Sequence, residues 1–153
     1  MPIPKYFALS YYYEKKQSKI ITPVDLYSVP FNSAHSLTVD ALWDTGANIS
    51  AITLEVQQQL NATTIDKKVI AGIHNTQLVD VVLITLELPN SVIKKNIKVA
   101  VCNITSNYGM IIGMDIITLG DFALSNNKDQ TLFSFAVPPF QEKIDFTKRK
   151  NEL

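Results

Sequence analysis

The chain has 153 residues, of which 46% are apolar and 18% are charged, and 14 basic residues balance 14 acidic ones. This length fits one domain with a buried core, and the composition is too apolar for a disordered chain. The zero net charge excludes a general positive field that would attract nucleic acid or anionic membranes, so neither is an expected partner.

The chain carries no sign of export or membrane insertion. No apolar run approaches the roughly 20 residues that cross a bilayer. The short apolar stretch near the N-terminus is soon followed by polar residues, which is a poor secretory signal. The single cysteine, Cys102, cannot form an internal disulfide, and we interpret it as a small buried apolar residue. We therefore expect a cytoplasmic protein.

The first third of the chain changes character near residue 19. Residues 1–18 are rich in tyrosine and then polar, and we expect them to form an N-terminal arm or an irregular segment. Residues 20–29 and 36–43 are rich in branched apolar side chains and flank a turn sequence. This pattern predicts two strands joined by a turn.

A short helix is predicted next, over residues 53–60. Thr53 is suited to cap its N-terminus, because a threonine hydroxyl can accept a hydrogen bond from the first turn. The apolar residues Leu54, Val56 and Leu60 are expected on one side of this helix.

Strands dominate the remainder of the sequence. The segments with β character are 63–70, 77–88, 92–101, 110–113, 122–124 and 131–137. A second short helix is expected over residues 115–119, with Asp115 as its cap, and residues 138–153 read as a polar C-terminal tail. Many short strands with one or two short helices predict an all-β domain over residues 19–137, in the form of a closed barrel.

The chemistry of the chain centres on Asp44-Thr45-Gly46, which directly follows an apolar strand. This order places a carboxylate on a tight turn at the end of a buried strand. Gly46 is expected to permit a backbone geometry that a side chain would forbid and to bring its N–H close to the acid. Thr45 offers a hydroxyl that can lock the turn, and Ala47 leaves it open. Taken alone, the triplet is more simply explained as a turn that Asp44 caps.

A second element lies about 65 residues downstream. Residues 111–113, Ile-Ile-Gly, are followed by Met114 and Asp115. Taken alone, this element is an ordinary buried strand that ends in a turn. The two elements in this order are far more specific together than either is alone.

The stretch from residue 20 to residue 137 resembles the retropepsin-like aspartic proteases, in particular a bacterial group. The resemblance rests on Asp-Thr-Gly, on Gly-Met-Asp-Ile-Ile-Thr-Leu-Gly-Asp-Phe-Ala over residues 113–123 and on Phe-Ser-Phe over residues 133–135. It implies an acid-protease-like barrel with a flap hairpin. It also implies that Asp44, in its turn with Gly46, is catalytic and that Thr45 ties two active-site turns together across a dimer. No metal or cofactor is implied.

The resemblance further implies a set of residues that contact a peptide substrate. Residues 69–77 occupy the place of the flap, a hairpin that closes over bound peptide. The implied substrate contacts are Ala47, Asn48, Ala71, Gly72, Ile73, His74 and Ile112. For His74 the alternative is a solvated turn histidine with no role.

The sequence departs from many viral members at two positions. Those members carry an acid two positions after the Asp-Thr-Gly glycine and an arginine after the downstream glycine, and these two residues pair. Here the positions hold Asn48 and Met114, so the ion pair cannot form. We expect Asn48 to bond to Asp115 or to the substrate backbone instead.

A single Asp-Thr-Gly motif predicts a homodimer. Amide hydrolysis by this route uses two carboxylates roughly 3 Å apart that share one proton. The sequence holds no second Asp-Thr-Gly or Asp-Ser-Gly, so the second acid must be Asp44 of another copy. The expected function is therefore an aspartic endopeptidase. The alternatives are a protease-fold dimer that binds extended peptides or partner proteins without cutting, and a structural module.

Overall fold

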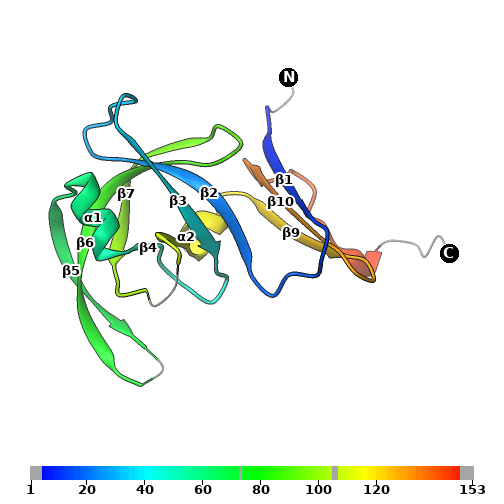
Figure 1. Ribbon diagram of the computed structural model, residues 1–153. Coiled ribbons are helices and arrows are strands. Elements are labelled where there is room, and N and C mark those ends of the chain that lie inside the picture. Colours follow the sequence, from blue (N-terminus) through cyan, green and yellow to red (C-terminus); the bar gives the residue numbers. More distant parts are fainter. Residues whose placement is uncertain (1–4, 73, 105–106, 149–153) are drawn as a thin grey trace.

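The computed structural model describes residues 5–72, 74–104 and 107–148. These residues form two β-sheets with two short α-helices (Figure 1), which confirms the predicted all-β class. In the described ranges, no helix has the length and apolar character needed to cross a membrane.

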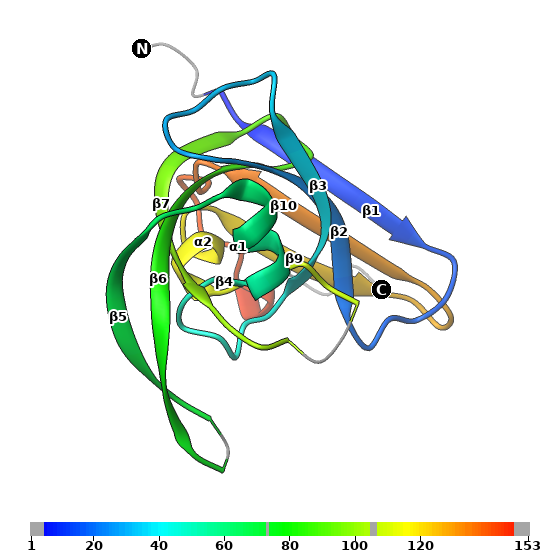
Figure 2. The ribbon, with the colours of Figure 1, turned by 60° about the vertical axis from the view of Figure 1, so that its left-hand side comes forward.

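The larger sheet closes on itself. Its strands are β2 (Ile20–Tyr27), β3 (Ser36–Trp43), β4 (Ala51–Ile52), β5 (Thr64–Ala71), β6 (Thr76–Glu87), β7 (Ile93–Val101) and β8 (Met110–Ile112). They pair in the order β2-β3-β8-β4-β7-β6-β5, and β2 also pairs with β6. The pairings therefore run in a ring from β2 round to β6, with β5 outside it, and Figure 2 shows how strongly the strands curve.

The smaller sheet joins the two ends of the described chain. It consists of β1 (Phe7–Tyr13), β10 (Thr131–Val137) and β9 (Asp121–Asn126), and all its pairings are antiparallel. The expectation of an irregular segment is therefore wrong for Phe7–Tyr13. Alternate side chains of β1 turn toward the core, where Leu9 is buried and Tyr11 packs against it. The division into arm, domain and tail stays a prediction.

The two sheets meet around Trp43, the last residue of β3. Its ring centroid lies 4.9 Å from that of Phe135 and 5.0 Å from that of Phe133. The indole Nε1–H donates a hydrogen bond of 2.9 Å to the buried Thr22 Oγ1. Because tilted aromatic pairs add about 0.5–1.5 kcal/mol to the gain from burial, this contact anchors the strand end that immediately precedes Asp44.

Helix α1 (Leu54–Leu60) follows the sequence pattern closely. The Thr53 side chain accepts a hydrogen bond of 3.2 Å from the Val56 N–H, which confirms the predicted cap. Val56 and Leu60 are buried, but the Leu54 side chain is 57% exposed. The expectation that Leu54 shares their apolar side is therefore wrong.

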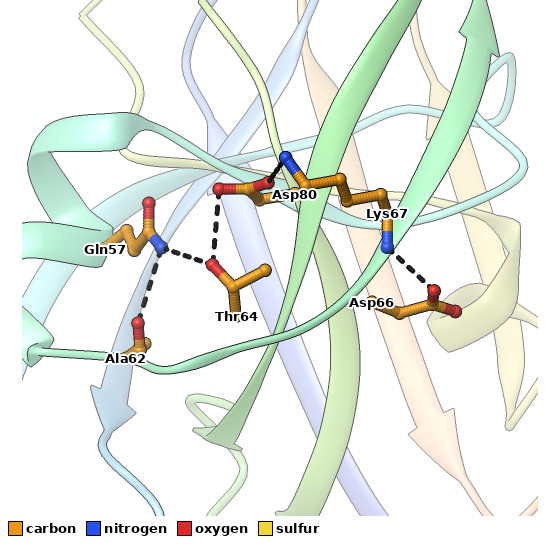
Figure 3. A network of polar contacts seen from close by, with 6 residues as sticks. All are labelled: Gln57, Ala62, Thr64, Asp66, Lys67 and Asp80. Carbon is orange, nitrogen blue, oxygen red and sulfur yellow. Dashed lines mark hydrogen bonds and ion pairs between the residues drawn. The ribbon is translucent and has the colours of Figure 1, made fainter.

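Polar contacts tie the end of α1 to the hairpin formed by β5 and β6 (Figure 3). Gln57 Nε2 donates to the carbonyl of Ala62 at 3.4 Å and to Thr64 Oγ1 at 3.5 Å. Thr64 Oγ1 donates in turn to Asp80 Oδ2 at 3.2 Å, and Lys67 forms an ion pair with Asp80 at 3.4 Å. The contacts of Thr64 and the ion pair of Lys67 are exposed, so each contributes little to stability, and together they orient the base of the hairpin.

The segment after β10 folds back against the smaller sheet. The Phe140 N–H donates to Asp121 Oδ2 at 2.7 Å, and the Phe140 ring lies 4.6 Å from that of Tyr6. A 3-10 turn, η1 (Phe146–Lys148), ends the described part of the tail.

Candidate active site

Asp44 lies on a turn directly after β3, where the sequence places it. Its backbone N–H donates to the Ile112 carbonyl at 2.8 Å, and its carbonyl accepts from the Ala47 N–H at 3.2 Å. The carboxylate Oδ1 accepts a hydrogen bond of 2.8 Å from the Gly46 N–H. Asp44 is half-buried, so the turn fixes the acid and leaves part of it accessible.

Gly46 gives space to the Asp44 carboxylate rather than freedom to the backbone. None of the chain's five glycines, all of which are described, has a positive φ, so that part of the prediction is wrong. A Cβ at Gly46 would lie 3.1 Å from Asp44 Oδ1. The glycine therefore lets the carboxylate fold back onto its N–H, as predicted.

The two sequence elements meet in space. Strand β8 runs parallel to β3, with Trp43 opposite Ile112, and antiparallel to β4. Helix α2 (Met114–Ile117) begins directly after Gly113, and the Met114 N–H donates to the Ala47 carbonyl at 2.7 Å. The end of β8 thus lies directly against the Asp44 turn.

Gly113 is required by a close backbone contact. Its φ of −94° is one that any residue can adopt. A Cβ at this position, however, would lie 2.8 Å from the Ala47 carbonyl oxygen and 2.9 Å from the Ile49 carbonyl carbon. Both obstacles are backbone atoms of the Asp44 loop, so any side chain here would push that loop away.

Asp115 bonds to Ser50, a residue that the sequence analysis did not assign to the site. Ser50 donates to it twice, from Oγ at 2.6 Å and from its backbone N–H at 3.0 Å. The expected bond from Asn48 to Asp115 is therefore wrong. Asp115 is also not the cap of α2, because Gly113 holds that position. The local sequence does not indicate this bond, because the two partners lie 65 residues apart along the chain.

Thr45 and Asn48 are both exposed. Within the described part of the chain, neither side chain makes a hydrogen bond. The prediction that the Thr45 hydroxyl locks its own turn is therefore wrong. A bond from Asn48 to a substrate backbone stays a prediction.

The β5–β6 hairpin lies where the resemblance places a flap. Its last pair is Ala71 opposite Thr76, and the Gly72 N–H donates to the Asn75 carbonyl at 2.7 Å. Ala71, Gly72 and His74 are exposed. The hairpin projects beyond the ring on the same side as the turn that follows β3 (Figures 1 and 2).

Two predicted substrate contacts need separate comment. Ile73 lies outside the described residues. Ile112 has no exposed surface, and its carbonyl accepts the hydrogen bond from the Asp44 N–H. Contact between the Ile112 side chain and a substrate stays a prediction, and the burial of this side chain does not support it. Ala47 is half-buried beside the acid.

A groove of about 870 Å³ lies elsewhere on the protomer, between β3, α1 and β6. Cys102 lines it, and partial burial raises the pKa of this thiol. Asp44 is not among the residues that line the groove. The chemistry of the Asp44 turn, rather than the volume of this groove, therefore locates the candidate active site.

Comparisons with known proteins rest on structure alone, since neither a family model nor a curated protein matches the chain. A retropepsin-like aspartic protease from Rickettsia conorii matches with a TM-score of 0.55 at 16% identity, covering 90% of this chain and 99% of that one. EIAV protease in complex with an inhibitor matches with a TM-score of 0.51 at 20% identity, covering 66% of this chain and 86% of that one. These two likenesses agree with the sequence motifs, and the chain has the retropepsin-like aspartic protease fold.

Proposed function

We propose that the chain is an aspartic endopeptidase that acts as a homodimer on extended peptides. The observation that carries the proposal is the Asp44 turn. Its carboxylate is partly exposed, accepts the Gly46 N–H at 2.8 Å and stands on a backbone fixed to Ile112. An acid that is held rigidly at the edge of a core, with part of it open to solvent, suits general acid–base chemistry.

The reaction needs a second carboxylate close to the first. Two acids roughly 3 Å apart share one proton, because both cannot stay ionised at that distance. The ionised member takes a proton from a water molecule, which attacks the scissile carbonyl carbon. The protonated member donates its proton to the carbonyl oxygen, which gives a tetrahedral diol. As the C–N bond breaks, the first member passes the proton that it took from water to the leaving amine, and the second member takes a proton back from a diol hydroxyl, so the pair again shares one proton. Asp44 is the acid of the motif in each copy, so the pair forms across two copies.

Several features support a second copy as the partner. A symmetric dimer presents the same surface twice, so an axis beside Asp44 brings the two Asp44 residues together. Thr45 is exposed next to the acid, and its hydroxyl is available to the other copy. Strands β1 and β9 are the edges of the smaller sheet and pair with no further strand among the described residues.

We assign the role of flap to the β5–β6 hairpin. β5 is an edge strand, and the exposed tip at Ala71, Gly72 and His74 can lie over an extended peptide. We assign contacts with the substrate backbone to Ala47 and Asn48, which lie on the loop that follows the acid.

A second candidate function is a dimer that binds extended peptides without cutting them. It is favoured by the exposed amide of Asn48 and the apolar Met114, which give the turn no ion pair. The two candidates differ in the separation of the two Asp44 carboxylates. A pair held several Å too far apart, with no closing motion, favours binding alone.

The proposal is tested by measuring mass in solution together with hydrolysis of a diverse peptide library in mildly acidic buffer. The wild type is compared with Asp44→Asn, which keeps the shape of the side chain and removes its acid. We expect a dimeric mass for both proteins and cleavage by the wild type alone. Equal cleavage by both proteins would refute the assignment of Asp44.

A further inference from the structure

Two side chains outside the acid chemistry join the Asp44 loop to helix α2. Ser50, at the end of the loop, is completely buried. Asp115, on the first turn of α2, receives both the hydroxyl and the backbone N–H of Ser50, at 2.6 Å and 3.0 Å. We call these two contacts the Ser50–Asp115 bridge.

The bridge has one consistent direction of donation. The Gly113 N–H donates to Ser50 Oγ at 3.0 Å, so the hydroxyl oxygen is an acceptor there and its proton points to Asp115. The oxygen that accepts the Ser50 hydroxyl, Asp115 Oδ1, also accepts the Ile116 N–H at 3.0 Å. The two carboxylate oxygens of Asp115 therefore accept from three donors, the Ser50 hydroxyl, the Ser50 N–H and the Ile116 N–H.

The bridge completes a set of ties along the loop. The start of the loop is held by the bond from the Asp44 N–H to Ile112, and its middle by the bond from Met114 to the Ala47 carbonyl. The bridge holds its end. Asn48 and Met114 cannot form an ion pair, so these three ties hold the loop within one protomer.

We propose that Ser50 and Asp115 are positioning residues for Asp44, an inference that rests on the proposed function. The bridge sets where the loop lies against α2, and so where the Asp44 carboxylate points when it meets its counterpart. Catalysis by paired groups is sensitive to such placement, since a shift of about 1 Å can lower a rate about a hundredfold.

The test compares peptide hydrolysis by the full chain with that of Ser50→Ala, Asp115→Asn and the double variant. Each single variant is expected to lower kcat at least about tenfold while KM stays within about threefold, because placement of the acid is lost and substrate binding is kept. The double variant is expected to be no slower than the slower single variant, since the two residues act as one unit.

The matched control is Thr118→Ala, at the other end of α2. Its hydroxyl donates to the Met114 carbonyl at 2.6 Å, a bond within the helix that does not involve Ser50 or Asp115. Its kcat is expected to match the wild type. All rates are measured well below each variant's unfolding temperature, so that a loss of stability does not appear as a loss of rate.

Amide hydrogen exchange provides a second measurement that does not depend on activity. Ser50→Ala is expected to speed exchange of the Gly113 N–H, and Asp115→Asn that of the Ser50 N–H. Folded variants that keep the wild-type kcat, even with a lower unfolding temperature, would overturn the positioning role. A wild type that cleaves no peptide would refute the proposed function and the positioning role together. Unchanged exchange of the Gly113 N–H in Ser50→Ala would refute the Ser50–Asp115 bridge itself.

Discussion

At the scale of single residues, the candidate site is built from close backbone contacts. A Cβ at Gly113 would meet backbone atoms of the Asp44 loop at 2.8 Å and 2.9 Å, and a Cβ at Gly46 would lie 3.1 Å from the Asp44 carboxylate. The sequence predicts a need for glycine at position 46 and uses Gly113 only as part of a motif. It does not predict the reason, because the obstructing atoms at Gly113 come from a segment that is distant in sequence.

Replacement of Gly113 by alanine is the sharpest residue-scale test of that contact. The added Cβ would press on the carbonyl groups of Ala47 and Ile49, so we expect a loss of about 1–3 kcal/mol in the free energy of unfolding, together with loss of peptide cleavage. Gly72→Ala at the exposed hairpin tip is the control, where the Cβ would lie 3.2 Å from the Asn75 carbonyl. Urea denaturation measures both, and equal stability losses would contradict the account.

Tyr27 gives a prediction about pH. Its hydroxyl donates to Glu87 Oε2 at 2.6 Å, and this bond, with a smaller effect of burial, raises the pKa of Tyr27 to about 12. Since the folded-state pKa lies above the ordinary value of 10.0, the added stability is complete below pH 10 and is lost as pH rises toward 12. The difference in urea midpoint between wild type and Tyr27→Phe is therefore expected to shrink between pH 10 and pH 12. A difference that stays constant over this pH range would show that the bond from Tyr27 to Glu87 does not stabilise the fold.

At the scale of elements, local signals predict the first helix and every ring strand except the two-residue β4, which is missed. The bounds of β3 are those expected, and α1 begins at the expected threonine cap and ends at Asn61, whose φ of 51° is left-handed. Strand β1 is missed because its tyrosine-rich sequence alternates only weakly. It becomes a strand through pairing with β10, more than 100 residues away.

The cap of α1 is open to a direct test. Thr53→Ala removes the oxygen that accepts the Val56 N–H, and we expect a loss of about 1 kcal/mol in the free energy of unfolding. Thr53→Ser keeps that oxygen and is expected to lose less than half as much. Thermal or urea unfolding measures the loss of stability in each variant. Equal losses in Thr53→Ala and Thr53→Ser would show that the hydroxyl does not stabilise the helix.

At the scale of the whole molecule, the aromatic contacts of Trp43 connect the smaller sheet to the strand that carries Asp44. The sequence motifs predict the retropepsin-like fold and place Asp44 on its turn. They do not predict Ser50 or the role of Trp43 as the joint between sheets, because both depend on partners distant in sequence. Position along the chain does not reveal which side chains will meet across a fold.

The smaller sheet yields a prediction about truncation. Deletion of residues 1–13 removes β1 and leaves one edge of β10 without its paired strand, and loss of the buried Leu9 alone removes about 2 kcal/mol of apolar burial. We expect a clear fall in the unfolding temperature, whereas deletion of residues 1–5 should leave it nearly unchanged. A truncation at residue 13 that unfolds at the wild-type temperature would show that β1 contributes nothing to the fold.

The central claim, that two copies share one catalytic pair, is tested most directly by mixing proteins. Asp44→Asn is added in increasing amounts to a fixed amount of wild type, the subunits are allowed to exchange, and the rate of peptide hydrolysis is measured. If each active site needs Asp44 from both copies, mixed dimers are inactive and the rate falls toward zero as the variant comes to dominate. A rate that stays at its initial value through the whole titration, with exchange of subunits verified, would show that one copy cleaves peptides alone.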